Sequence, residues 1–159
     1  MSQNIVQQQR ENFNFAYSLL MQFIDVCPDD LWGKKFGGWP VWQQVYHALT
    51  ALDFFVAAPD AKPIQGFVPQ DVANLSVQGQ EPLSKNQLKE FASLAKTGAD
   101  KYLDSLTDVD LTTKAQGASM RMKRETTHAT IMIFLTGHIL YHLGTLDAAL
   151  REQGLQGVF

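Results

Sequence analysis

The chain has 159 residues, of which 45% are hydrophobic and 18% charged, and its formal net charge at pH 7 is -3. This length and composition predict a single folded domain over residues 1–159 and exclude a disordered chain. The negative charge argues against nucleic acid as the main partner, because phosphate binding needs a basic surface. The one cysteine, Cys27, cannot form an intrachain disulfide, and the N-terminal residues lack the pattern of a signal peptide. We therefore expect a cytoplasmic protein.

The first half of the chain contains two stretches with the three-and-four spacing of apolar residues that is typical of amphipathic helices. The spacing predicts a helix over residues 4–26, which Pro28 ends. A second helix is expected over residues 40–57, because Pro40 suits the first turn of a helix. The intervening segment is rich in glycine, and we interpret it as a connection.

A long connection of about two dozen residues, 58–83, is punctuated by proline and glycine, and it is longer than a tight helical bundle needs. It ends at a third predicted helix, which opens with Ser84 and Gln87 in the S-x-x-Q pattern of a capping box. The predicted core face of this helix consists of Leu88, Phe91, Leu94, Ala95, Tyr102 and Leu106.

A fourth helix is predicted over residues 127–153, after a linker that spans residues 107–125. Its run of apolar residues is interrupted by His138, His142 and Asp147, which are costly in lipid, so we expect no membrane span. The helix is apolar almost all round, which predicts that it is buried. Four helices without strand-like alternation indicate an all-α protein.

His138 and His142 lie four residues apart in the segment G-H-I-L-Y-H-L-G, residues 137–144. On a helix this spacing places both imidazoles on one face, where they can share a ligand. Burying two polar rings costs free energy unless each finds a partner. The partner can be a neighbouring backbone group or carboxylate, or it can be a metal ion, because imidazole is a common ligand of zinc, nickel and iron.

His47 is the best candidate for a third ligand, since it is the one histidine of the second predicted helix. On a helical wheel it lies nearly opposite the apolar cluster that Val45, Leu49 and Leu52 help to form. Periodicity therefore favours a surface histidine, although two faces of a bundle helix can contact different neighbours. The pattern alone leaves both interpretations open.

The motif W-P-x-W at residues 39–42, His47, and the motif G-H-x3-H-x-G at residues 137–144 occur in this order. Their order and spacing resemble the DinB/YfiT-like superfamily over essentially the whole chain. The resemblance implies an up-down-down-up four-helix bundle in which one histidine of helix two and an H-x3-H pair of helix four bind a divalent metal. The matching positions are His47, His138 and His142, and zinc or nickel is the expected ion.

The resemblance also implies a function, because related proteins include metal-dependent transferases that use low-molecular-weight thiols and proteins described as metal-dependent hydrolases. We therefore expect a small-molecule substrate, with a small thiol or water activated at the three-histidine site, and a homodimer. The alternative is a non-catalytic dimeric bundle, ligand-binding or stress-associated, whose histidines are a relic or a structural metal site. The catalytic residues beyond the metal ligands stay undetermined.

The other ionisable and aromatic residues are interpreted without a role as metal ligands. Asp53 and Asp147 lie well around their helices from the histidines, so they are expected to be caps, partners that orient the metal ligands, or solvated surface groups. Tyr141 lies beside the histidine face, where it can donate to a substrate oxygen, but burial in the core is the favoured interpretation. His128 lies ten residues before His138, about 15 Å along a helix, and cannot share its site. The basic group around Arg121 is either an attractor of anionic substrates or a solvated loop.

Overall fold

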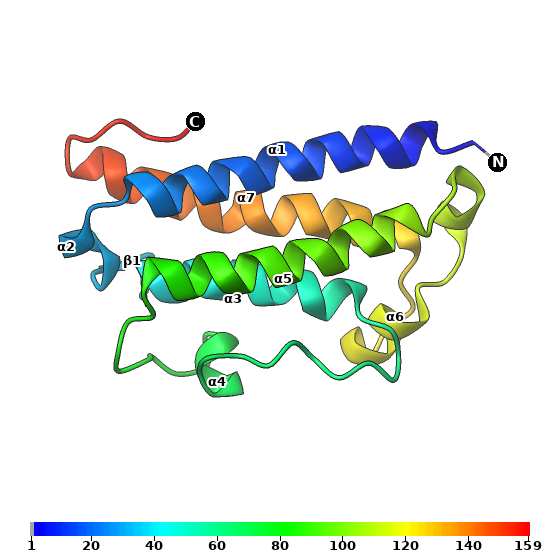
Figure 1. Ribbon diagram of the computed structural model, residues 1–159, viewed down its shortest axis with the longest axis horizontal. Coiled ribbons are helices and arrows are strands. Elements are labelled where there is room, and N and C mark those ends of the chain that lie inside the picture. Colours follow the sequence, from blue (N-terminus) through cyan, green and yellow to red (C-terminus); the bar gives the residue numbers. More distant parts are fainter. Residues whose placement is uncertain (1) are drawn as a thin grey trace.

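The computed structural model describes residues 2–159, which are mostly helical with two short strands. Four long helices lie side by side along the longest axis of the molecule (Figure 1): α1 (Asn4–Val26), α3 (Val41–Val56), α5 (Lys85–Asp104) and α7 (His128–Glu152). In the ribbon, α1 and α7 run in one direction, and α3 and α5 run in the other. The prediction of an all-α protein is confirmed.

The predicted helix ends match the observed ones, and side-chain caps stabilise the starts of α5 and α7. The Ser84 hydroxyl accepts a hydrogen bond of 3.2 Å from the amide of Gln87, and the Gln87 side chain accepts one of 2.9 Å from the amide of Ser84. This capping box satisfies amide groups that the first turn of a helix leaves unpaired. At the start of α7, the Thr127 hydroxyl accepts from the amide of Thr130.

The predicted connections contain short elements that periodicity does not reveal. Such elements are too short to show a period, and long-range contacts stabilise them instead. The strands pair as an antiparallel hairpin with Phe36 opposite Trp39. The short elements are α2 (Asp29–Trp32), β1 (Lys35–Phe36), β2 (Trp39–Pro40), α4 (Gln70–Ala73), the 3-10 helix η1 (Asp108–Thr112) and α6 (Gln116–Met122).

The core lies between the four long helices, where α3 packs against α5 and α7, and α1 packs against α7. Its largest fully buried side chains include Trp42, Tyr46 and Phe91, and the rings of Tyr46 and Phe91 meet edge to face at 5.0 Å. Burial of such side chains is the main stabilising contribution. The predicted core face of α5 is wrong at Leu94, whose side chain is 53% exposed.

Helix α7 is long and apolar enough to cross a membrane by length and composition, and here it packs against α1 and α3. The prediction that α7 is buried all round is wrong. Ile133 is 62% exposed and Tyr141 is 76% exposed, so Tyr141 is not a core residue. Within residues 2–159 no other helix covers Ile133 and Tyr141, so these side chains of α7 face outward.

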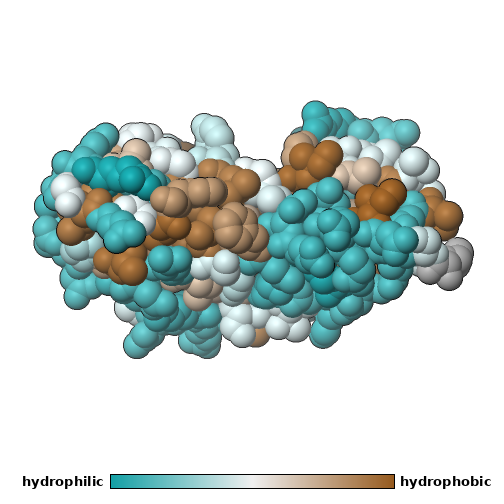
Figure 2. All heavy atoms as spheres, turned by 90° about the horizontal axis from the view of Figure 1, so that it is seen from above, coloured by the Kyte–Doolittle hydropathy of each residue, from teal (hydrophilic) through white to brown (hydrophobic). Residues whose placement is uncertain are grey.

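The C-terminal segment 155–159 folds back beside α1 and α7 and is tied there by Asp147. The buried carboxylate of Asp147 accepts hydrogen bonds from the amide of Val158 at 2.5 Å and from Nε of Arg151 at 2.7 Å. The same edge exposes apolar groups, and Phe159 meets Phe15 edge to face at 6.3 Å. Figure 2 shows an apolar area among hydrophilic atoms on this side of the molecule. Asp147 therefore anchors the chain end rather than standing solvated.

Candidate metal centre

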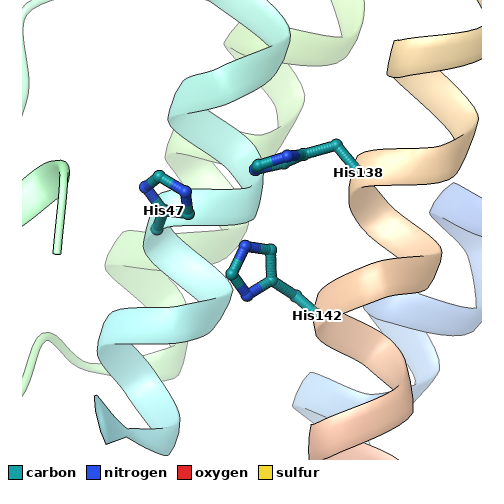
Figure 3. Close-up of side chains that lie close together, drawn as sticks. All are labelled: His47, His138 and His142. Carbon is teal, nitrogen blue, oxygen red and sulfur yellow. The ribbon is translucent and has the colours of Figure 1, made fainter. Parts of the chain in front are cut away.

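Three histidines from two helices point toward one another between α3 and α7 (Figure 3). His47 comes from α3, whereas His138 and His142 lie one turn apart on α7. The ring centroids are separated by 5.0 Å for His47 and His138, 4.9 Å for His47 and His142, and 4.8 Å for the α7 pair. One ring nitrogen of each residue lies within 4.8 Å of the others.

The interpretation of His47 as a surface histidine is wrong, because its ring is half-buried and faces α7. The physical reason is that α3 is covered on several sides, by α5 and α7 and by the short helix α4. The wheel of α3 alone could not show this, because the second apolar contact involves a segment of the long connection.

The ring of His47 is fixed by a backbone group of this connection. Its Nδ1 lies 2.8 Å from the carbonyl oxygen of Ala73, the last residue of α4. A carbonyl oxygen only accepts, so Nδ1 carries the proton and donates it, and the lone pair of the neutral ring is on Nε2. This is the arrangement in which metal-binding histidines are usually held by an outer partner.

His138 and His142 have no such partner in the described chain. Nε2 of His138 is buried without a hydrogen-bond partner, and its ring contacts Phe55 edge to face at 5.8 Å. His142 is buried, with 6% of its surface exposed. A buried imidazole nitrogen without a partner costs free energy, and a metal ion is the kind of partner that would satisfy it.

Burial keeps all three imidazoles in the neutral form that binds metals. Burial lowers the pKa of His47, although its hydrogen bond to Ala73 opposes the shift. Burial, together with the charge of a protonated His47, lowers the pKa of His138 to about 4. Burial and then the two neighbouring imidazoles lower the pKa of His142 to about 3. Three neutral donors at one point suit a divalent cation.

The geometry fits an ion after a small adjustment. Metal–nitrogen bonds to imidazole measure about 2.0 to 2.1 Å, so two nitrogens on one ion lie at most about 4.2 Å apart. A separation near the 4.8 Å limit of the cluster therefore requires the rings to move inward slightly. Rotation about the side-chain bonds of His47 and His138, which are half-buried, would bring their nitrogens closer to that of His142.

Cavities of different character border the cluster on two sides. A cavity of about 340 Å³ reaches His47 and His138 and is lined by apolar groups that include Ala51, Phe54 and Phe55. Another cavity of about 310 Å³ reaches all three histidines. The second cavity is lined by Trp39, Leu75, Tyr141 and Thr145, among others, and two of these residues carry hydroxyl groups. Phe55 was not expected at the site, and Trp39 was identified only as part of the W-P-x-W motif, because only the fold brings these residues to the histidines.

The acidic residues nearest to the histidines in sequence hold connections instead of the site. Asp53 accepts a hydrogen bond of 3.0 Å from the amide of Ile64, and Asp147 binds the C-terminal segment. The expectation that they act as caps is close to their observed role, since each carboxylate accepts from backbone amides. Neither has a hydrogen bond to a histidine among the described residues.

The remaining sequence candidates also lie outside the cluster. His128 contacts Tyr102, with 2.7 Å between Nδ1 and the phenol oxygen. Arg121 donates hydrogen bonds to the carbonyl oxygens of Phe54 at 2.7 Å and Ala57 at 2.5 Å, at the end of α3. Arg121 thus caps the C-terminal end of α3. The sequence had suggested only an attractor of anionic substrates or a solvated loop. Burial raises the pKa of the Cys27 thiol to about 11, which makes it a weak nucleophile.

A mostly helical fold with three converging imidazoles defines a helical protein with a candidate divalent-metal centre. The sequence model of the DinB superfamily matches residues 12–146, a range that contains all three histidines. The chain therefore belongs to the DinB superfamily, and the resemblance seen in the sequence is confirmed. Comparison with curated proteins and with solved structures found no match.

The buried histidines predict a stability that falls in acid for the metal-free protein. An unfolded histidine has a pKa of about 6.5, so below that pH the unfolded chain binds protons that His142, with its pKa of about 3, does not. The free energy of unfolding therefore falls as the pH drops from about 6.5 toward 4. Between pH 7 and 4.5, the free energy of unfolding should fall by about 2 kcal/mol less in His142→Gln than in the wild type. Urea unfolding with a chelator present measures this difference. Equal losses would contradict the burial of a neutral His142.

Proposed function

We propose that this protein is a metal-dependent enzyme that transfers a small thiol to a small molecule with an apolar part. His47, His138 and His142 would hold the divalent ion, with zinc or nickel as the expected identity. The observation that carries the proposal is that two cavities of different chemistry border the same imidazoles. A transfer between two molecules needs two such spaces next to one reacting centre.

Three imidazole ligands leave coordination positions free, which is typical of catalytic rather than structural sites. A divalent ion supplies one chemical property there, since it lowers the pKa of a bound water or thiol. The chain itself contributes no carboxylate to the cluster, because Asp53 and Asp147 bind backbone amides elsewhere. The role of the protein is then to hold the ligands and to orient the two reactants.

The cavity volumes favour transfer over hydrolysis. A water molecule occupies about 30 Å³ of liquid, which is far less than either cavity offers. Ala51, Phe54 and Phe55 suit an apolar electrophile, whereas the hydroxyls of Tyr141 and Thr145 suit the polar groups of a small thiol. In the reaction, the thiol loses its proton, its sulfur bonds to the electrophilic carbon, and the leaving group departs with its electron pair. Hydrolysis is the alternative if water replaces the thiol.

We also infer an up-down-down-up four-helix bundle, supported by the opposed directions of the helix pairs in Figure 1, and a homodimer. The support for the dimer is the outward face of α7, where Ile133 and Tyr141 are exposed. No Asp, Glu, Lys or Arg occurs between His128 and Leu146. An uncharged, partly apolar helix face suits burial against a second copy of the chain.

Metal content tests the site directly. We expect about one equivalent of zinc or nickel per chain in protein purified without an affinity tag, and a loss of that metal in His142→Ala, because two imidazoles bind far more weakly than three. His128→Ala is the matched control, since His128 lies on the same helix but pairs with Tyr102. Metal content measured by mass spectrometry that is the same in all three proteins would contradict the assignment.

The two cavities predict that the two substrates respond to different substitutions. Phe54→Ala should raise the KM for an apolar electrophile about tenfold, because of the two cavities beside the histidines it removes apolar surface from the apolar one alone. Tyr141→Phe should instead raise the KM for the thiol, because it removes a hydroxyl from the other cavity. Steady-state kinetics with each substrate varied in turn measures both. Metal-loaded protein without turnover on any thiol and electrophile would favour the non-catalytic alternative.

The dimer proposal predicts that a charge on the outward face of α7 separates the subunits. Ile133→Lys should yield a monomer, because an unpaired ammonium cannot be buried against an apolar partner. Val109→Lys is the control, since Val109 is similarly exposed, at 63%, but lies on η1. Light scattering after size exclusion gives the mass. A monomeric wild type, or two dimeric variants, would overturn the proposal.

A further inference from the structure

The long connection between α3 and α5 reaches the metal centre through its short helix α4. The segment is seated on α3, since Val72 and Ala73 are buried with 8% and 4% exposed. The Ala73 carbonyl is the group that accepts the Nδ1 proton of His47 at 2.8 Å. The orientation of one candidate ligand therefore depends on how firmly a connection of the chain is held.

The side chain that holds the connection is Gln43, which is fully buried on α3. Its Nε2 donates to the carbonyl oxygens of Val72 at 2.8 Å and Val77 at 2.7 Å. Its Oε1 accepts from the amide of Gly79 at 3.0 Å. Both amide hydrogens and the oxygen are thus used, and these three partners also determine which end of the amide is nitrogen.

Gln43 and the three backbone groups that it binds form a clamp, and this clamp lies next to the metal centre. Gln43 precedes His47 by four residues, so both side chains lie on one face of α3. The carbonyl of Val72, which Gln43 binds, is one peptide unit away from the carbonyl of Ala73, which His47 binds. A shift of the segment at Val72 would therefore move the acceptor of the His47 proton.

Close packing allows the segment to approach α3. A Cβ atom placed on Gly79 would lie 2.4 Å from the Trp42 ring, a distance at which atoms overlap. Only glycine permits the amide of this residue to reach Oε1 of Gln43. The clamp is therefore a specific arrangement of Gln43 and the connection.

We propose that Gln43 is a positioning residue of the metal centre: by binding the connection at Val72, Val77 and Gly79, it holds the Ala73 carbonyl against His47. This rests on the proposed role of His47 as a ligand. Gln43 contacts neither the ion nor a substrate. It acts through the backbone, and it gives the long connection a role in keeping Nε2 of His47 directed toward the other two imidazoles.

The chain offers a closely matched control in the next residue. Gln44 is also buried, with 3% exposed, and its Nε2 also donates to two backbone carbonyls, those of Phe36 at 2.7 Å and Trp39 at 3.0 Å. These carbonyls belong to the hairpin of β1 and β2 and not to the connection. Gln44 also lines the cavity of about 310 Å³ beside the histidines, but its hydrogen bonds among the described residues go to the hairpin and not to a histidine or to α4. A loss of stability should follow from either substitution, whereas a loss of ligand orientation should follow only from that of Gln43.

The test compares Gln43→Met and Gln44→Met for the affinity of Zn²⁺, measured by competition with a chromogenic chelator. The melting temperature of each metal-free protein is measured in parallel. We expect both variants to melt earlier, but only Gln43→Met to lose about 10- to 100-fold in affinity, as when outer partners of metal ligands are removed. Equal affinities in the two variants would overturn the proposal, whether both are weakened or both are unchanged.

A second measurement applies if Gln43→Met does not fold, and it needs no metal. In Gln43→Asn the side chain keeps its neutral amide but is one methylene shorter, so it cannot reach all three backbone partners in the connection. Nitrogen-15 NMR of the imidazoles in metal-free protein should show His47 protonated at Nδ1 in the wild type and as a mixture of tautomers in Gln43→Asn. An unchanged tautomer in this variant would overturn the proposal. Wild-type protein in which His47 is protonated at Nδ1 but which does not bind Zn²⁺ would instead contradict the proposed function.

Discussion

The packing of α3 against α7 is the contact on which the candidate site depends, because it places three neutral imidazoles between two helices. Polar rings in such a position are costly unless something binds their nitrogens. One of them, His47, is satisfied by a backbone carbonyl, while Nε2 of His138 has no partner in the described chain. As core residues the histidines would leave a buried nitrogen unpaired, whereas as metal ligands each would direct a nitrogen at the ion. A metal centre therefore explains the arrangement better than packing does.

The connections that pack around α3 also belong to the candidate site. Buried or half-buried polar side chains of α3 bind backbone groups of the segments that cross it: Gln43 binds the α4 segment, Gln44 the hairpin, and Asp53 the residue Ile64. Arg121 of α6 caps the end of the same helix. The α4 segment supplies part of the wall of both cavities, and the hairpin supplies part of the wall of one. The rigid helices therefore carry the ligands, and the loops tied to them shape the space in which substrates would bind.

The sequence predicts the long helices well because their signals are local. The capping box at Ser84 and the apolar spacing of α1 place helix limits within a residue of those observed. The H-x3-H pair is likewise local, since one turn of helix brings both rings to one face. His47 is different, because its own wheel places it away from the apolar face. Only the resemblance to the DinB superfamily brought it to the site, and the fold shows why: a distant connection covers that side of α3.

Most of the rest could not have been predicted, because it depends on contacts between residues far apart in the chain. The acceptor of His47 is a backbone carbonyl 26 residues away, which no side-chain pattern encodes. The short elements α4 and α6 and the hairpin are held by such long-range bonds and have no period. Exposure of Tyr141 also depends on what packs against α7, and the apolar composition of that helix suggested the opposite.

The proposed site requires three imidazoles to bind one ion, and X-ray absorption spectroscopy of the zinc-loaded protein tests this most directly. We expect three imidazole nitrogens at about 2.0 to 2.1 Å and a further light-atom ligand that a small thiol replaces with sulfur. Fewer than three imidazoles, or a shell completed by protein groups that added thiol leaves unchanged, would contradict it.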